Sequence, residues 1–410
     1  MFDQVTRTNE QNIAVIEINN PPVNALGYEV RKGILGCLKA AEADDAVAAI
    51  VIIGSGRTFP AGADITEFGT VMKEPHLPEV IDHIESCSKP VVAALHGTAL
   101  GGGFEIALGS HYRIADANAR VGLPEVHLGL LPGAGGTQRL PRLCGAAFAL
   151  EVMLKGTPVS AEAAKDVGLI DRITKSDLRR AAITFATEVR TVRKTCDETS
   201  QLTDHPAYRA DLAKAHNMVT SRMRGQIAPL KIIKCVGAIL EKPFHEGRQL
   251  ERQCFMDCMA SDQSKGMIHA FFAERSSAKV PEASRAEPRI LETLGVVGGG
   301  TMGAGITVAA LNGGLPVTMI ERDAESIARG RGNVEKVYDR LVAKGRMTTN
   351  EKNTLMALYT GSTNYNDLSN VDMVIEAVFE RLDVKRAVFE KLDKVIKPGA
   401  VLASNTSYLN

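Results

Sequence analysis

Apolar and polar positions follow two alternating patterns in the first quarter of the chain. Residues 13–19 are mostly apolar and run into Asn20, Pro21 and Pro22, which predicts a strand that ends in a turn because proline disfavours helix. A helix over about 26–44 should follow, then an apolar strand over 46–53, a glycine-rich turn at 54–56 and a buried strand over 91–95. Strands that alternate with helices predict a layered α/β unit.

From about Ser160 onward the pattern becomes helical, with an amphipathic stretch over 251–274. This stretch carries a set of large flexible and aromatic side chains: Met256, Met259, Met267, Phe271 and Phe272. A stripe of this kind usually belongs to a hydrophobic core, and we interpret it so.

A second pattern begins after residues 276–288, where Ser, Ala, Lys, Glu and two prolines replace apolar periodicity, as is typical of a linker. Strands are then expected over 293–297, 317–321, 373–377 and 401–404, again with helical stretches between them. The sequence therefore predicts a first domain over 1–280, a linker over 281–293 and a second α/β domain over 294–410.

The composition excludes several classes of protein. The 410 residues are 45% hydrophobic and 23% charged, as in ordinary soluble globular proteins, and 48 Lys+Arg balance 48 Asp+Glu. A net charge of zero argues against nucleic acid as a partner, since duplex binding needs a basic surface. The apolar run 46–53 is far shorter than the ~20 residues that span a bilayer, and residues 1–30 do not resemble a signal peptide, so we expect neither a membrane span nor secretion.

The cysteines predict no metal site. There are seven of them, scattered, without a CxxC pair and without histidines at zinc spacing. We interpret them as buried or incidental thiols in a reducing compartment. Cys254 and Cys258 lie four residues apart on a predicted helix, a spacing that fits side-by-side packing as readily as redox chemistry, and we favour packing.

Three stretches of the first domain are unusually rich in glycine and alanine. They are residues 59–65 (Phe-Pro-Ala-Gly-Ala-Asp-Ile), residues 96–105 with glycine at 101–103, and Leu-Pro-Glu at 123–125 followed by the glycine-rich 132–139. Small residues let a backbone approach a ligand closely and aim its N–H groups. Glycines just before a helix also favour a developing negative charge, as an oxyanion hole requires, although each stretch alone could be an ordinary turn.

Together with Asn-Pro-Pro-Val-Asn-Ala-Leu at 20–26, these stretches resemble the crotonase (enoyl-CoA hydratase/isomerase) superfamily over roughly residues 10–275. The resemblance implies a ββα spiral fold in which Ala61 and Gly102 supply the two N–H groups of the oxyanion hole. It places Ala63 and Asp64 on the loop along the adenine end of coenzyme A. It also counts Gly62 and Gly133 among the substrate-binding positions. Pro60 stands where many members have Ala, Ser or Cys.

The same resemblance matches Glu105 and Glu125 to the two catalytic glutamates of the family. Hydrating a 2,3-double bond conjugated to a thioester requires a proton to leave water at C3 and another to reach C2. Two close carboxyl groups whose pKa values are pushed apart can divide these roles. We assign Glu125 as the proton donor to C2 and Glu105 as the group that orients and activates water.

A dinucleotide-binding fingerprint opens the second domain. Gly298, Gly300 and Gly303 follow the predicted strand directly, and Glu321 ends the next strand about 20 residues on. The first glycine permits the turn, the second the approach of the pyrophosphate and the third close helix packing, while Glu321 can bind the ribose hydroxyls and would repel a 2′-phosphate. We therefore expect NAD rather than NADP, although Arg322 beside Glu321 argues the other way.

Further residues, Glu-Ala-Val-Phe-Glu at 376–380, then Lys385, then Ser-Asn-Thr-Ser at 404–407, resemble the 3-hydroxyacyl-CoA dehydrogenase NAD-binding domain of Rossmann type, with a doubly wound sheet. The resemblance implies that Met302 and Glu321 line the cofactor. It places Val378, Glu380 and Lys385 close to the cofactor, with Glu380 and Lys385 near the nicotinamide ribose, and Ser407 at the substrate hydroxyl. The catalytic histidine of that family follows the serine motif by some twenty residues, so we expect that the chain as far as Asn410 does not oxidise 3-hydroxyacyl-CoA.

The leading hypothesis is a trans-2-enoyl-CoA hydratase joined to a dehydrogenase NAD-binding domain, as in the multifunctional enzymes of fatty-acid β-oxidation. Coenzyme A would enter as part of the substrate. One alternative is a 3-enoyl-CoA to 2-enoyl-CoA isomerase or another acyl-CoA enzyme, and a second is a non-catalytic acyl-CoA and NAD binding module. We expect a cytoplasmic protein if the source is bacterial and a peroxisomal one otherwise. The oligomeric state and the preferred acyl length stay open.

Overall fold

The computed structural model describes residues 4–67, 73–277, 279–281, 283 and 286–409. It forms two compact units, Met1–Lys279 and Val280–Asn410, which are treated separately below. Residues 282, 284 and 285 of the expected linker and the terminal Asn410 lie outside the described residues.

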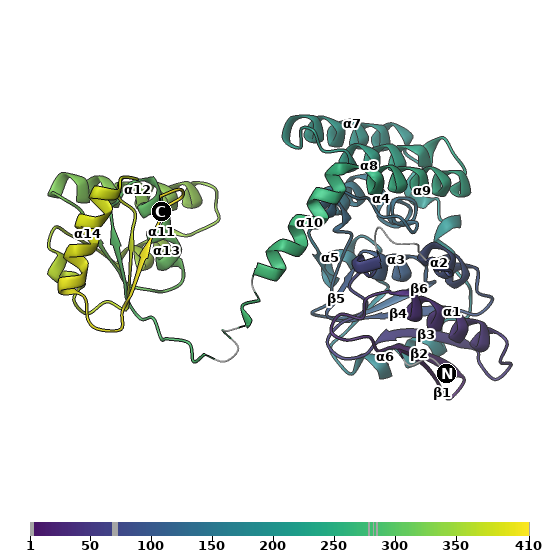
Figure 1. Ribbon diagram of the computed structural model, residues 1–410. Helices are drawn as coiled ribbons and strands as arrows, with labels where there is room; N and C mark the ends of the chain where they lie inside the picture. Colours follow the sequence, from purple (N-terminus) through teal and green to yellow (C-terminus); the bar gives the residue numbers. More distant parts are fainter. Residues whose placement is uncertain (1–3, 68–72, 278, 282, 284–285, 410) are drawn as a thin grey trace. The chain divides into compact units, whose positions relative to one another are not determined.

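The first unit contains a six-stranded sheet in the order β1-β2-β3-β4-β6-β9 (Figure 1). Its strands are β1 Val5–Glu10, β2 Ile13–Ile18, β3 Ala49–Gly54, β4 Val91–Leu95, β6 Tyr112–Asp116 and β9 Arg172–Thr174. Only the β1–β2 pair is antiparallel among these neighbours. The apolar runs of β3 and β4 are buried along their whole lengths, as parallel strands covered on both faces require. A second, three-stranded sheet joins β5 Thr98–Leu100, β7 Arg120–Gly122 and β8 Val159–Ser160.

Ten helices surround these sheets in the described part of the first unit. They are α1 Tyr28–Glu42, α2 Leu77–Ser86, α3 Gly102–Gly109, α4 Gly136–Lys155, α5 Ala161–Asp166, α6 Leu178–Glu188, α7 His205–Arg222, α8 Ala228–Gly237, α9 Phe244–Ala260 and α10 Asp262–Ser277. Short 3-10 turns are η1 Ile65–Glu67, η2 Glu125–Leu128, η3 Thr195–Asp197, η4 Ser200–Leu202 and η5 Ala238–Leu240.

The large sheet has a core on each face. Even-numbered positions of β2 and β3 pack with α1, α2 and α3 in the main hydrophobic cluster, and odd-numbered positions pack with α6 in a smaller cluster. Figure 1 shows α6 on the opposite side of the sheet from α3. The period-two alternation of strand side chains thus decides which face each residue serves.

The amphipathic stretch expected over 251–274 is two helices. The backbone at Ser261 is extended and ends α9, and α10 begins at Asp262. The break changes the faces that the residues after Ser261 present. Part of the expected core stripe is wrong, because Met256, which precedes the break, is 48% exposed and Phe272, which follows it, is 39% exposed.

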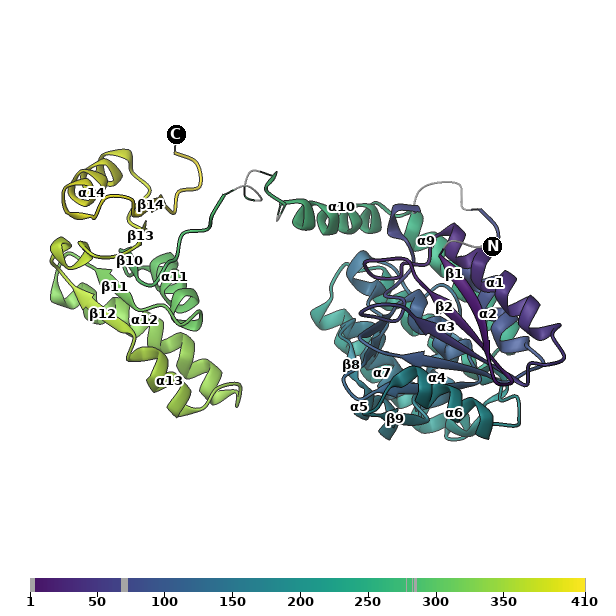
Figure 2. The same cartoon turned by 90° about the horizontal axis from the view of Figure 1, so that it is seen from below.

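The second unit is built on a five-stranded parallel sheet in the order β12-β11-β10-β13-β14 (Figure 2). Its strands are β10 Leu294–Val297, β11 Val317–Ile320, β12 Tyr359–Ser362, β13 Met373–Glu376 and β14 Val401–Ser404, and its helices are α11 Thr301–Asn312, α12 Ala324–Ala343, α13 Thr349–Met356 and α14 Leu382–Val395, with a 3-10 turn η7 Tyr365–Leu368. Helices α11, α12 and α13 share one hydrophobic cluster with the sheet, and α14 shares the other. The strand order reverses on either side of β10, which creates the crevice where doubly wound sheets bind ligands.

None of the helices in the described ranges combines the length and the apolar character that a membrane crossing needs.

Candidate functional site

A cavity of about 340 Å³ opens in the first unit. Segments far apart in the sequence line it, and they include all the residues expected there from the three glycine-rich stretches: Ala61, Gly62, Ala63, Asp64, Gly102, Glu105, Glu125 and Gly133. The fold therefore brings the three stretches to one place.

The glycines before α3 are required by close backbone packing. Gly101 has a φ of +52°, which side chains rarely tolerate. A Cβ on Gly103 would lie 1.8 Å from the carbonyl oxygen of Pro60, so only glycine lets α3 begin against the loop of the first stretch. The start of α3 is thereby held beside that loop at the cavity wall.

The two alanines of the first stretch differ in what their N–H groups do. The N–H of Ala61 donates to the carbonyl oxygen of Val23 at 3.1 Å and is therefore engaged within the protein. The nitrogen of Ala63 lies 3.5 Å from the position that a Cβ would take on Gly102. The geometry therefore corrects the expectation for Ala61 and brings Ala63 beside Gly102. The difference arises at Gly62, whose φ of +117° turns the chain between them.

Glu105 is buried in α3 and fixed by the backbone of another segment. Its Oε1 accepts hydrogen bonds from the N–H groups of Ala134 and Gly136, each at 2.8 Å. Burial, followed by repulsion from Glu251, raises the pKa of Glu105 to about 7. A carboxyl group with such a pKa exchanges protons readily near neutral pH.

Glu125 opens the 3-10 turn η2 and is held quite differently. Its Oε2 is enclosed and has no hydrogen-bond partner among the described residues. Burial, followed by repulsion from Glu105, raises the pKa of Glu125 well above its usual range. The neutral, protonated form of Glu125 is therefore favoured relative to that of an exposed carboxyl group.

A third glutamate, Glu251 of α9, belongs to the same cluster and escaped the sequence analysis. It is buried, its Oε1 accepts from Gly135 N–H at 2.7 Å, and its Oε2 accepts from the N–H and the hydroxyl of Thr137 at 2.9 and 2.6 Å. A signal existed in the sequence, because Glu251 shares a helix face with Cys254 and Cys258, at spacings of three and seven residues, and both are buried.

Ion pairs surround this cluster. The buried guanidinium of Arg139 pairs with Glu85 at 2.7 Å and with Asp82 at 3.0 Å. Arg248 pairs with Asp82 at 2.5 Å, and its Nε lies 3.8 Å from Glu251 Oε1. Helices α2, α4 and α9 are thus tied together behind the carboxyl groups.

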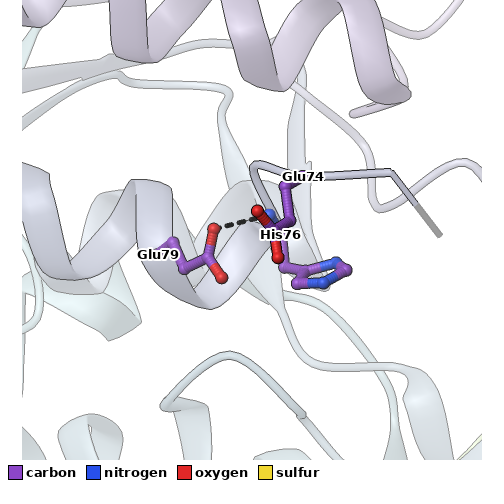
Figure 3. Close-up of side chains that lie close together, drawn as sticks. All are labelled: Glu74, His76 and Glu79. Atoms are coloured by element: carbon purple, nitrogen blue, oxygen red, sulfur yellow. Dashed lines mark hydrogen bonds between the residues drawn. The ribbon is translucent and has the colours of Figure 1, made fainter.

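Beside the cavity, Glu74, His76 and Glu79 place one potential ligand atom each within 4.8 Å of one another (Figure 3). Both glutamates are exposed, and Glu79 Oε2 already accepts the backbone N–H of His76 at 3.1 Å. This contact is the ordinary capping of the first turn of α2 and needs no metal ion.

The second unit has a cavity of about 1060 Å³ beside the carboxyl ends of β10, β11 and β13. Most of the residues expected at the cofactor line it: Gly298, Gly300, Met302, Glu321, Val378 and Glu380. Ser407, expected at the substrate hydroxyl, lines it as well. Gly303 lies behind this wall, where a Cβ would come 1.7 Å from the carbonyl oxygen of Gly298. A Cβ on Gly300 would meet no atom within 4 Å, so the backbone there is open to a ligand.

Glu321 and Lys385 both make contacts within the protein. Glu321 Oε1 accepts the N–H of Gly299 at 2.7 Å, so this carboxylate anchors the glycine loop as well as facing the cavity. Lys385 is buried and is not among the residues that line the cavity, so its expected contact with the cofactor stays a prediction. Its ammonium group pairs with Glu376 at 2.7 Å and with Glu380 at 3.2 Å. The position of Lys385 in the first turn of α14 turns its side chain toward the end of β13.

Glu380 is fixed on its other side by the segment that follows β14. It accepts hydrogen bonds from the Thr406 hydroxyl and from Ser407 N–H, the latter at 2.9 Å. These bonds, with the Lys385 ammonium as a smaller cause, lower the pKa of Glu380 to about 2. Ser407 and an ionised Glu380 therefore stay together at the cavity wall.

Comparison with known families gives two matches. Residues 8–224 match the family described as enoyl-CoA hydratase/isomerase. Residues 293–410 match the family described as 3-hydroxyacyl-CoA dehydrogenase, NAD binding domain.

Curated relatives match along nearly the whole chain. The peroxisomal bifunctional enzyme of Danio rerio is 39% identical over 408 residues, which are 98% of this chain and 56% of the relative. The peroxisomal fatty acid beta-oxidation multifunctional protein of Oryza sativa subsp. japonica is 35% identical over 413 residues, 97% of this chain and 57% of the relative. The chain thus spans about half the length of the curated relatives it matches.

A solved structure shares the fold of the first unit. The enoyl-CoA hydratase/isomerase of Pseudoalteromonas atlantica T6c is 23% identical, with a TM-score of 0.50, over 66% of this chain and 98% of that one.

Proposed function

This chain belongs to the enoyl-CoA hydratase/isomerase family, and from that premise we propose that its first unit adds water across the 2,3-double bond of a trans-2-enoyl-CoA. The observation that carries the proposal is the unequal pair of carboxyl groups in one cavity. Glu105 is fixed by two N–H groups and has a pKa of about 7. Glu125 has a raised pKa, which favours its protonated form, and an enclosed oxygen without a partner among the described residues.

The two groups have complementary roles in this reaction. Glu105, ionised, accepts a proton from a water molecule as the water oxygen bonds to C3. The electron pair of the double bond moves toward the thioester carbonyl, and Glu125 delivers its proton to C2. The net result is addition of one water, after which a proton returns from Glu105 to Glu125. Proton transfer of this kind contributes about 10²–10⁴-fold to a rate.

The developing negative charge on the thioester oxygen needs N–H donors. Because the N–H of Ala61 is engaged by Val23, the proposed donors are Ala63 and Gly102. Gly102 is the first residue of α3, where the unpaired N–H groups and the helix dipole favour negative charge.

Hydration is tested with a short trans-2-enoyl-CoA by the loss of the enone absorbance. The wild-type protein should turn over, and Glu105→Gln and Glu125→Gln should each lose about 10²–10⁴-fold in kcat. Glu151→Gln on the exposed face of α4 is the matched control and should keep full activity. Activity undiminished in both active-site variants would sink the assignment.

Isomerisation is a second candidate, favoured by one observation. In its ionised form, Glu125 can take a proton from C2 of a 3-enoyl-CoA and return it to C4 through its enclosed, partner-free oxygen, without help from water. Conversion of 3-enoyl-CoA to 2-enoyl-CoA that depends on Glu125 and survives Glu105→Gln would support this activity. A module that only binds acyl-CoA and NAD would show binding without turnover in both assays.

For the second unit we propose NAD as the cofactor and 3-hydroxyacyl-CoA, the product of hydration, as the substrate of the full dehydrogenase. NAD supplies a hydride acceptor when bound. The open backbone at Gly300 fits a pyrophosphate, and the Glu321 carboxylate fits ribose hydroxyls. Titration calorimetry with NAD and NADP tests this, and tighter binding of NADP would contradict it. The names of the relatives also favour the peroxisomal alternative for the compartment.

A further inference from the structure

Resting on the proposed hydration, we propose that Glu251 is a positioning residue of the hydratase site. It fixes the segment 134–137, whose N–H groups hold Glu105, and its negative charge keeps Glu105 exchanging its proton near neutral pH. Glu251 does not line the cavity, so it acts on the reaction through the neighbouring carboxyl groups, above all Glu105.

The geometry is an alternation along four consecutive residues at the start of α4. The N–H groups of Ala134 and Gly136 point to Glu105, and those of Gly135 and Thr137 point to Glu251. The two carboxyl groups therefore lie on opposite sides of one strip of backbone. A shift of this strip toward or away from one of them changes the hydrogen bonds of the other.

Burial raises the pKa of Glu251, while Arg248 and the hydrogen bonds from Thr137 and Gly135 oppose this shift and favour the ionised form. Its two oxygens accept three donors, from Gly135 N–H and from the N–H and hydroxyl of Thr137. Arg248, whose Nε lies 3.8 Å away, compensates part of the charge.

This buried charge acts on Glu105. After burial itself, repulsion from Glu251 is the largest cause that raises the pKa of Glu105, and it is larger than the opposing effect of either the Ala134 or the Gly136 hydrogen bond taken singly. The other titratable or charged groups around the pair are Glu125 on η2, Asp82 and Glu85 on α2, Arg139 on α4, Cys235 on α8, and Arg248 and Cys254 on α9. Removing the charge at 251 should therefore lower the pKa of Glu105.

A purely structural role for Glu251, anchoring α9 to α4, predicts something else. It predicts a loss of stability with an unchanged pKa of Glu105 and an unchanged kcat in the protein that stays folded. Asp257 offers a matched control on the same helix, because its carboxylate pairs with Lys231 of α8 at 2.7 Å and accepts a hydrogen bond from Gln253.

The experiment compares the full chain with Glu251→Gln and Asp257→Asn. Infrared spectroscopy follows the C=O band of the protonated Glu105 carboxyl against pH, assigned by subtracting the spectrum of Glu105→Gln. The pH profile of kcat/KM for a trans-2-enoyl-CoA is measured in parallel, and thermal unfolding reports stability.

In Glu251→Gln, the infrared midpoint and the acid limb of kcat/KM should both move to lower pH by about one unit. The plateau kcat should fall about 10- to 100-fold through misplacement of Glu105, with little change in KM. Asp257→Asn should lose stability only. A midpoint that stays or rises in Glu251→Gln overturns the proposal, as does an unchanged kcat.

The experiment distinguishes failure of the proposed hydration from failure of the proposed role of Glu251. If the wild-type protein hydrates no 2-enoyl-CoA, the proposed function fails, and the infrared midpoints still decide whether Glu251 controls the protonation of Glu105.

Discussion

Glu105→Gln should make the first unit more stable at neutral pH while it abolishes most of the activity. In the wild-type protein the buried carboxyl group has a pKa of about 7 against 4.5 in an unfolded chain. Each pH unit corresponds to about 1.4 kcal/mol, so ionising Glu105 in the folded state costs about 3 kcal/mol. Glutamine has no such cost, and its Oε1 can still accept the N–H groups of Ala134 and Gly136.

The sign of the stability difference between Glu105→Gln and the wild type follows from the pH at which Glu105 ionises in each state. Below pH 4.5 Glu105 is protonated in both states and the substitution is nearly neutral. Between pH 4.5 and 7 the unfolded chain releases the proton and the folded chain retains it, so wild-type stability falls as the pH rises. The variant should therefore gain on the wild type by about 3 kcal/mol between pH 4.5 and pH 8.

The assay is hydrogen exchange as a function of denaturant, followed by mass spectrometry of peptides from β3 and β4, because these buried strands report the first unit alone. Glu151→Gln, which changes the same atoms on an exposed helix surface, should give no pH-dependent difference. A constant difference between Glu105→Gln and wild type from pH 4.5 to 8 would refute the reasoning, because it would mean that Glu105 ionises in the folded state as freely as in water.

Three further changes have definite expected outcomes. Glu85→Gln removes the charge that pairs with buried Arg139 at 2.7 Å, so unfolding of the first unit should cost about 3 kcal/mol less in the same exchange measurement; a loss within error would contradict this. Gly103→Ala places a Cβ 1.8 Å from the oxygen of Pro60, so calorimetry should show no native transition of the first unit, whereas an unshifted one would contradict the packing. Glu321→Ala removes the carboxylate that anchors the glycine loop, so the Kd for NAD should rise about tenfold, and an unchanged Kd in titration calorimetry would show that the loop holds without it.

The parts of the molecule that sequence predicted are those encoded locally. A few neighbouring residues are enough to predict the apolar strands β3 and β4, the glycine fingerprint after β10 and the turns around Gly101. The glutamates 105 and 125 were found because each lies inside such a stretch.

The parts that sequence missed depend on contacts between distant residues. Glu251 meets Gly135 across 116 positions of sequence, and no periodic pattern records such a pairing. The choice between Ala61 and Ala63 depends on the turn at Gly62, which a motif does not specify. Met256 was expected in a core but is exposed. Which face of α9 is buried depends on how the helix packs against its neighbours, and the sequence of the helix alone does not specify this.

The structure also changes the meaning of the glycine-rich segment 132–139. Sequence alone suggests that its N–H groups face a ligand, but the groups from 134 to 137 bind two glutamates of the protein itself. Gly135 has a φ of +107°, and a Cβ on Gly136 would lie 2.9 Å from Glu105 Oε1. Glycine is needed at 135 because a Cβ there would lie 1.8 Å from the Arg139 guanidinium, and at 136 because Glu105 approaches the backbone so closely. The segment therefore sets the position and the proton affinity of Glu105, and Glu105 itself lines the cavity.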